Sequence, residues 1–276
     1  NPFVDETILL QRKTIAGISS AWRALRAKRF DLAVDFQGLL KSALVASVAH
    51  PDHIFGFHQS LLRERLAALF YSDRVLAKTA HVVDRNLELA TAAGASSVVH
   101  AFPLPEGTPE GDLPDGEFIL ANPLAGWPGK QWPMEYYAEL AGSVRREFGV
   151  PLVLNGPPQA RDLLSRVPEA LVNISGIPGL IYATRKARAV VGIDSGPMHL
   201  AAALGKPGVA IFGPTDPARN GPYGGTFRTL RSAQAVTSYK RRHEVEPCMR
   251  EIAPRDVLEA LREQFSLQNL SLGCSG

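Results

Sequence analysis

The stretch VVGIDSGPMHLAAALGKPGVAIFGPTDPARNGPY, residues 190–223, holds a complete strand–turn–helix–strand pattern. An apolar run ends at Asp194, a Ser-Gly-Pro turn follows, and an alanine-rich helical segment starts at Met198. A second apolar run, Gly208–Phe212, comes next. Continuous apolar strands that alternate with helices predict a parallel sheet covered on both faces. Since ligands bind beyond the carboxyl ends of strands in such sheets, Asp194 is predicted at a binding edge.

The same alternation continues through most of the chain. Other short β-branched or apolar runs predict strands at Leu32–Phe36, Phe118–Ala121, Leu152–Leu154 and Ala189–Ile193. Helical patterns occupy Ile18–Arg29, Lys41–Ala49, Leu61–Tyr71, Val82–Ala93, Met134–Phe148, Met198–Leu204 and Pro254–Phe265. The predicted fold class is therefore α/β, with two Rossmann-like halves.

One segment interrupts this rhythm. FPLPEGTPEGDLPDG, residues 102–116, is too rich in Pro, Gly and acids for a helix or a central strand, and we interpret it as a linker. It separates a first domain, 1–101, from a second, 117–253, and residues 254–276 form a closing helix and tail. A site in the cleft between two such halves is the expectation.

Composition narrows the function classes. With 276 residues, 45% of them hydrophobic, the chain can bury two cores. A net charge of +3 is too small to favour a nucleic-acid partner. No apolar run approaches the roughly 20 residues that a membrane-spanning helix needs. Cys248 and Cys274 lack the spacing of a zinc site, so free thiols are expected.

The turn after Asp194 suits a phosphate. Gly196 allows a ligand close to the backbone, and the amino terminus of the following helix offers N–H groups and partial positive charge. His199, in the first turn, can donate to a phosphate oxygen. The alternative is that Asp194 or Ser195 only caps the helix and His199 packs against it. The Gly- and Pro-rich loop at 212–223 favours the ligand site.

Two further loops are predicted at the same edge. In ANPLAGWPGKQWP, residues 121–133, Lys130 supplies a cation at the end of a Gly- and Pro-rich loop that does not have Walker spacing. Trp127 and Trp132 either stack on a base or brace the loop, and bracing is expected of at least one. NGPPQ, residues 155–159, is the third loop. Together they predict a nucleotide-diphosphate site. The chain has no D-x-D metal clamp, so no metal is expected, and Lys130 with the helix terminus would neutralise the phosphates.

The first half contributes three features that contain basic residues. DFQGLLKS, residues 35–42, turns from a strand into a helix and would present Gln37, Gly38, Lys41 and Ser42 to the cleft. Arg63 heads a predicted amphipathic helix whose default interpretation is a solvated face. The run from Arg12 to Arg29 contains six basic residues and no acid. It fits a helix on an anionic membrane or, equally, a helix packed on the sheet with a charged rim.

These motifs resemble those of the bacterial heptosyltransferases. The likeness lies in IDSGPMHLAAALGKPGVAIFGPTDPARNGPYG, residues 193–224, and CMREIAP, residues 248–254. In the first half AVDFQGLLKSALVA, RERLAALFY and HVVDRNLEL (33–46, 63–71, 81–89) resemble the heptosyltransferase I type. The resemblance implies the GT-B architecture of two facing Rossmann-like domains. It also implies inverting, metal-independent transfer of heptose from ADP-L-glycero-D-manno-heptose to Kdo-lipid A.

Roles follow from the resemblance residue by residue. Lys130 would meet the donor phosphates as the catalytic residue, in a loop lined by Ala125 and Gly126. The other implied donor-binding residues are Asp194, Ser195, Gly196 and His199. Acceptor binding is implied for Gln37, Lys41 and Arg63. No cofactor besides the ADP-heptose substrate is expected. A monomer at the cytoplasmic face of a Gram-negative inner membrane is expected.

The chain departs from the family in two places. It begins after the family's first strand and its Gly-Asp loop, which carries the proposed general base, so we expect donor binding without transfer. Asp35 is the next candidate for a base. Gln159 and Ala160 stand where an acidic ribose contact is expected. The alternatives are a heptosyltransferase II type paralogue, a sugar-nucleotide epimerase of similar fold, and a non-catalytic ADP-sugar-binding fragment.

Overall fold

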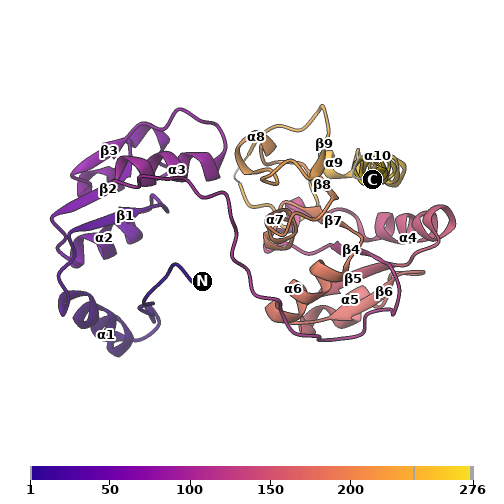
Figure 1. Ribbon diagram of the computed structural model, residues 1–276, viewed down its shortest axis with the longest axis horizontal. Helices are drawn as coiled ribbons and strands as arrows, with labels where there is room; N and C mark the ends of the chain where they lie inside the picture. Colours follow the sequence, from indigo (N-terminus) through magenta and orange to yellow (C-terminus); the bar gives the residue numbers. More distant parts are fainter. Residues whose placement is uncertain (1, 239, 274–276) are drawn as a thin grey trace. The chain divides into compact units, whose positions relative to one another are not determined.

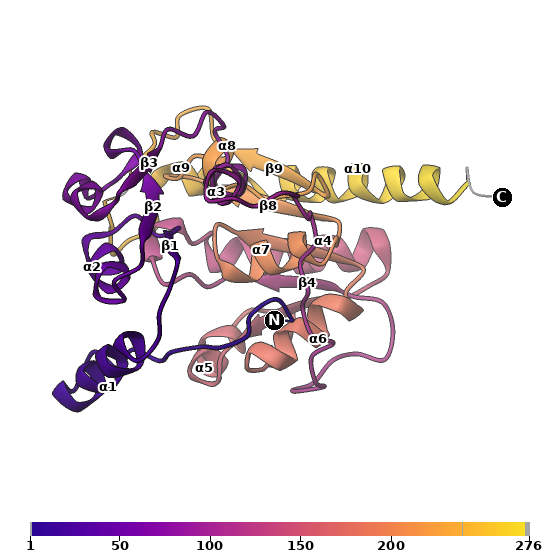
Figure 2. The same cartoon turned by 60° about the vertical axis from the view of Figure 1, so that its left-hand side comes forward.

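The computed structural model describes residues 2–238 and 240–273, with side chains to residue 267. Contacts divide the chain into two compact units, Asn1–Ala101 (unit 1) and Phe102–Gly276 (unit 2). Both units are α/β (Figures 1 and 2). Within the described residues, no helix is long and apolar enough to cross a membrane.

Unit 1 is built on a three-stranded parallel sheet in the order β1-β2-β3. The strands are Leu32–Asp35, His53–Phe57 and Asp73–Val75. The helices are α1 (Ile15–Arg26), α2 (Leu40–Val48) and α3 (Val82–Ala92), with 3₁₀ turns η1 (Gln59–Leu61) and η2 (Arg65–Phe70). Thr14 starts α1 because its hydroxyl accepts from the Gly17 amide at 3.1 Å. The core is small, centred on Ala43, Phe57, Tyr71 and Leu89.

Unit 2 is built on a six-stranded parallel sheet in the order β6-β5-β4-β7-β8-β9. The strands in chain order are Ile119–Asn122, Leu152–Gly156, Leu171–Ile174, Ala189–Ile193, Gly208–Phe212 and Phe227–Arg231. The chain leaves β4 in one direction to β5 and β6 and then returns to β7 on the other side. This reversal makes the carboxyl end of β4 and β7 the topological switch point, where sheets of this kind bind ligands.

Helices cover both faces of the unit 2 sheet. Figure 1 shows α4 (Met134–Phe148) and α10 (Pro254–Gly273) on one face, and α6 (Ile177–Lys186) and α7 (Gly196–Ala203) on the other. The last turns of α10 extend beyond the sheet (Figure 2). The shorter elements are η3 (Pro128–Lys130), η4 (Pro158–Ala160), α5 (Arg161–Leu164), α8 (Pro217–Asn220) and α9 (Pro247–Arg250). Along β4, Ile119 and Ala121 join the larger core and Leu120 joins the other, which confirms the expected two-sided sheet.

The Pro-, Gly- and acid-rich stretch 102–116 contains no helix or strand, as predicted. It belongs to unit 2, within which Arg185 Nη2 donates to Leu104 O at 2.9 Å and Gly176 N donates to Glu110 Oε2 at 2.7 Å. These bonds fix the stretch to the residues in and beside α6.

The predicted helix Leu61–Tyr71 is wrong. The segment forms two short 3₁₀ turns separated by extended backbone at Leu62. The leucine periodicity misled the prediction, because Leu66 and Leu69 are 63% and 72% exposed while Ala67 and Ala68 are buried. Arg63 therefore lies in a loop between the turns and does not head a helix.

Candidate functional site

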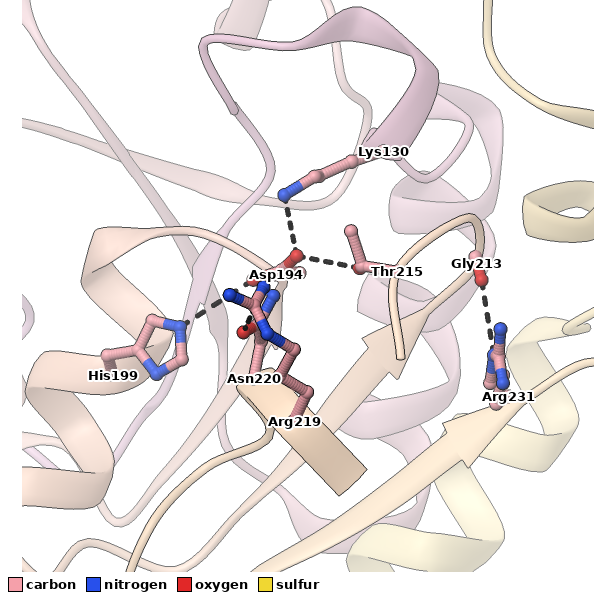
Figure 3. A network of polar contacts seen from close by, with 8 residues as sticks. All are labelled: Lys130, Asp194, His199, Gly213, Thr215, Arg219, Asn220 and Arg231. Carbon is pink, nitrogen blue, oxygen red and sulfur yellow. Dashed lines mark hydrogen bonds and ion pairs between the residues drawn. The ribbon is translucent and has the colours of Figure 1, made fainter. Parts of the chain in front are cut away.

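Three side chains meet at the carboxyl edge of the unit 2 sheet (Figure 3). Asp194 follows β7, Lys130 ends η3 in the loop after β4, and Thr215 lies in the loop after β8. Since β4, β7 and β8 are parallel neighbours, their following loops emerge at one edge. The sequence therefore brings together residues from three separate loops.

Asp194 is the centre of this group. Its Oδ2 atom accepts from Lys130 Nζ at 2.6 Å and from Thr215 Oγ1 at 2.7 Å. His199 Nε2 lies 3.6 Å from the other carboxylate oxygen. The side chains of Asp194 and Lys130 are only 8% and 17% exposed, whereas His199 is 43% exposed. The ion pair is thus mostly withdrawn from water, and the imidazole remains accessible.

The charge state of Asp194 follows from these contacts. Burial by itself raises the pKa of this carboxyl, but the nearby His199 ring, the hydrogen bonds from Lys130 and Thr215 and the charge of Lys130 outweigh it and lower the pKa to about 2. Asp194 is consequently ionised at neutral pH. With so low a pKa, its carboxylate is too weak a base to serve as a general base. Its action is to hold the Lys130 ammonium and the His199 ring in place.

Aromatic residues fix the loop that carries Lys130. Trp132 is 1% exposed and donates from Nε1 to Ile252 O at 2.8 Å, so it braces the loop as expected of one tryptophan. Trp127 lies beneath the ammonium, 4.8 Å from Lys130 Nζ to the ring centroid. Ala125 is partly buried and its carbonyl accepts from Gln131 Nε2 at 3.1 Å, while Gly126 is exposed.

The amino terminus of α7 has no side-chain cap. Ser195 occupies the capping position without a capping hydrogen bond, and its Oγ is buried with no partner among the described residues. Gly196 is exposed, and no atom lies within 4 Å of where a Cβ would stand. The capping alternative for Asp194 or Ser195 is therefore wrong. This helix end is open to an anion.

A cavity of about 200 Å³ lies at the same edge. Its walls include Leu124 and Pro157 from the loops after β4 and β5, and Ile177 and Pro197 from the first turns of α6 and α7. Asn122, 2% exposed, also lines it, and neither polar atom of its amide has a partner among the described residues. A buried unpaired amide in a largely apolar pocket is a ready contact for a ligand.

Two of these residues were missed by the sequence analysis. Asn122 is the last residue of β4, and Asp194 directly follows β7. The position of Asn122 at the end of a predicted strand, beside the switch point, could therefore have identified it as a candidate. Thr215 lies within the predicted loop 212–223, but nothing in the pattern marked its hydroxyl. Gln159 is exposed and does not line the cavity, although Asn155, Gly156 and Pro157 of the same predicted loop do.

In unit 1 the turn after β1 surrounds a buried aspartate. Asp35, 5% exposed, accepts from the amides of Gln37 and Gly38 at 2.9 and 3.1 Å. It also accepts from Ser42 Oγ at 2.8 Å and Tyr71 OH at 2.7 Å. These four donors make Asp35 the organiser of the turn rather than a base. Burial raises the pKa of Tyr71, and the hydrogen bond to Asp35 and the charge of that carboxylate raise it further.

The predicted acceptor residues divide by exposure. Gln37, Lys41 and Arg63 are all exposed. Gly38 is buried at φ +66°, whereas Ser42, which donates to Asp35, lines a cavity of about 500 Å³ together with Gln37 and Lys41. Among the described residues no group of three His, Cys, Asp or Glu side chains could hold a metal.

Known proteins match this arrangement. The model of "Glycosyltransferase family 9 (heptosyltransferase)" matches residues 18–249. An Escherichia coli lipopolysaccharide heptosyltransferase 1 is 34% identical over 217 residues, which cover 73% of this chain and 65% of that relative. The chain thus spans just under two thirds of that relative. Salmonella typhimurium lipopolysaccharide heptosyltransferase 2 is 30% identical, covering 88% of this chain and 78% of the relative.

Solved structures agree. The E. coli heptosyltransferase WaaC with ADP is 27% identical, with a TM-score of 0.68, over 92% of this chain and 80% of that one. The E. coli ADP-heptose heptosyltransferase II gives 26% identity and a TM-score of 0.66, over 90% and 80%. The fold class is accordingly that of the GT-B heptosyltransferases, as expected. With parallel α/β units, an Asp194-centred edge and a family match over most of its length, the chain belongs to glycosyltransferase family 9, the heptosyltransferases.

Proposed function

We propose that this chain binds ADP-L-glycero-D-manno-heptose through unit 2 and serves the transfer of heptose to Kdo-lipid A in lipopolysaccharide core synthesis, as a monomer, with inversion and without a metal. The observation that carries the proposal is the Lys130–Asp194 pair beside the open end of α7. A buried ion pair adds little net stability, so its place at the ligand edge favours a binding role.

The donor fits this edge in parts. The diphosphate would lie against the Lys130 ammonium and the N–H groups at the start of α7, with His199 as a further donor. The nucleobase would enter the cavity of about 200 Å³ and use the unpaired amide of Asn122. A related structure, 27% identical, contains ADP-2-deoxy-2-fluoro heptose, which supports an ADP-sugar as the donor.

The proposed reaction is a single displacement. The acceptor hydroxyl attacks the anomeric carbon from the face opposite ADP, and the bond from that carbon to the diphosphate breaks with its electron pair leaving on ADP. The hydroxyl proton passes to a base other than Asp194 or Asp35, since the pKa of Asp194 is too low for it to take up the proton and Asp35 already accepts from four donors. Lys130 and the α7 terminus stabilise the charge that grows on the diphosphate.

The working surface we propose is an anionic membrane on the cytoplasmic side. Helix α1 exposes Ile15, Ile18 and Trp22 by 89%, 45% and 47%, at the spacing of one helical face. Basic residues surround this stripe, among them Arg12, Lys13, Arg23 and Arg26. Apolar and basic groups together are the combination that binds anionic bilayers.

The test is to incubate the chain with ADP-heptose and Kdo-lipid A in EDTA and follow the lipid by mass spectrometry. The proposal expects one heptose to be added to the lipid and ADP to be released, a result that would overturn the expectation of donor binding without transfer. Addition only to a lipid that already carries heptose would assign the second paralogue. Conversion of ADP-heptose without lipid modification would instead assign an epimerase. Binding of ADP-heptose without product would limit the function of the chain to donor binding. If product formed only after Mg²⁺ was added, the proposal of metal-independent transfer would be wrong.

A further inference from the structure

Two segments of unit 1 that carry the acceptor candidates are joined by a side chain that the proposed function does not use. Leu40 N, the first amide of α2, donates to Glu64 Oε2 at 2.8 Å across 24 positions of sequence. Lys41 follows Leu40 and Arg63 precedes Glu64. The hydrogen bond therefore joins the immediate neighbours of the two acceptor cations.

A second bond ties the same segments from inside. Tyr71 OH, at the end of η2, donates to the oxygen of Asp35 that also accepts from Ser42. Tyr71 is 3% exposed, so this inner tie belongs to the core. Glu64 differs because it is exposed, and its bond is not needed to fill the core.

An exposed carboxylate here is electrostatically unfavourable for anion binding. It is adjacent in sequence to Arg63, and its hydrogen bond is to the residue before Lys41. It would therefore repel an acidic sugar or phosphate that those cations attract. A residue that weakens the charge of a site is useful there when it fixes the geometry, as a hydrogen bond to a helix-end amide does.

We propose that Glu64 is a positioning residue for the acceptor: it fastens the Arg63 loop to the start of α2 so that Arg63 and Lys41 address one anionic group of the acceptor. This inference rests on the proposed function. The ligand chemistry is an acidic sugar or a phosphate on a lipid, bound by two cations held at fixed spacing.

The proposal predicts opposite signs for two substitutions. Glu64→Ala removes the charge and the hydrogen bond, and should weaken binding of Kdo-lipid A in detergent micelles by roughly 3- to 10-fold, the range for one hydrogen bond. Glu64→Gln removes the charge but keeps an oxygen that accepts from Leu40 N, and should bind as tightly as wild type or more tightly. If charge alone mattered, both variants would bind more tightly, and that result would overturn the proposal.

Two controls separate the remaining cases. The Kd for ADP should be the same in all three proteins, and only Glu64→Ala should speed hydrogen exchange of the Leu40 amide. Weakened ADP binding in the alanine variant would indicate general damage and count against positioning. Lipid A without Kdo serves as the second probe. If wild type binds lipid A as tightly as Kdo-lipid A, the proposed acceptor is wrong, and the comparison of Glu64→Ala with Glu64→Gln still tests the positioning role. If wild type binds neither lipid, the proposed acceptor and the positioning role are both wrong.

Discussion

Two buried aspartates at strand ends, Asp35 in unit 1 and Asp194 in unit 2, have different roles because their hydrogen-bond partners differ. Asp35 is surrounded by amides and hydroxyls of its own turn and of Tyr71, all of which donate without carrying charge. Asp194 meets an ammonium and a hydroxyl from two other loops and an imidazole from α7. The first arrangement shapes a turn. The second holds a cation at the edge of the sheet where we propose that the diphosphate binds.

Lys130→Ala should weaken binding of an ADP-sugar by about 10- to 150-fold, equivalent to about 1.5–3 kcal/mol for a hydrogen bond to a charged group. The loss has two causes, because the ammonium contact disappears and Asp194 is left buried beside the phosphates. Isothermal titration in EDTA measures it. Lys186→Ala, an exposed lysine on α6 of the same unit, is the matched control and should bind like wild type. Equal losses in both variants would contradict the role of Lys130.

The depressed pKa of Asp194 predicts a specific pH dependence of stability. The carboxyl has a pKa of about 2 in the fold against its ordinary value of 3.8, so the ionised carboxylate stabilises the fold fully above about pH 4 and this stabilisation is lost as pH falls through about 2. The amount is about 2 kcal/mol. In urea unfolding of unit 2, the advantage of wild type over Asp194→Asn should shrink from pH 5 to pH 2.5. A constant difference over that range would show that the ion pair does not depress this pKa.

At the scale of elements, burial explains which parts of the fold the sequence could reveal. The central strands β4, β5, β7 and β8 are buried at every position, so their uninterrupted apolar runs predicted them. The edge strands β6 and β9 were missed because each is only partly buried and mixes polar with apolar residues. Edge strands carry a weaker pattern because only part of their surface meets the core.

The candidate site follows the same logic. Lys130 and Asp194, 64 positions apart, were expected at one edge because each follows a strand of one parallel sheet, and they do meet there. The hydroxyl of Thr215 could not be foreseen, since Thr is common in turns for purely local reasons, whereas Asn122 could have been found from its position at the end of β4. The prediction for Leu61–Tyr71 failed because contacts with distant residues set the conformation of this short segment: Tyr71 bonds to Asp35, and Glu64 bonds to Leu40.

Helix α1 gives the prediction that belongs to a single element. The double variant Ile15→Ser/Trp22→Ser should reduce co-sedimentation with phosphatidylglycerol vesicles several-fold. Each change removes exposed apolar surface from the stripe that would enter the bilayer. Raising the salt concentration should weaken binding of wild type. Leu163→Ser, at an exposed leucine of α5 in unit 2 that is 44% accessible, is the control. Unchanged sedimentation of the double variant would mean that α1 is not the membrane contact.

At the scale of the whole molecule, the two units differ in how much core they possess. Unit 1 has three strands, and β1 at its edge borders a cavity of about 500 Å³ that reaches from Leu10 to Ala49. Unit 2 has six strands with helices on both faces. A larger fraction of buried surface gives greater stability, so unit 1 should unfold first.

Calorimetry should therefore show two transitions. ADP at about 100 times its Kd should raise only the upper one, by about 2.7 kcal/mol of added stability in unit 2. Hydrogen exchange read on peptides from each unit assigns the transitions. A single transition that moves as a whole with ADP would show that the units unfold as one.

The contact between Lys130 and Trp127 has an optical consequence. An indole's emission energy depends on the electric field at its ring, and here an ammonium stands 4.8 Å from the centroid. A diphosphate that draws the ammonium away or screens it changes that field, so donor occupancy should shift the emission of Trp127. Trp132, whose Nε1 donates to Ile252 O, and Trp22 on α1 of unit 1 supply the background emission. The site thus contains its own fluorescent reporter, which allows donor binding to be titrated in an unlabelled protein.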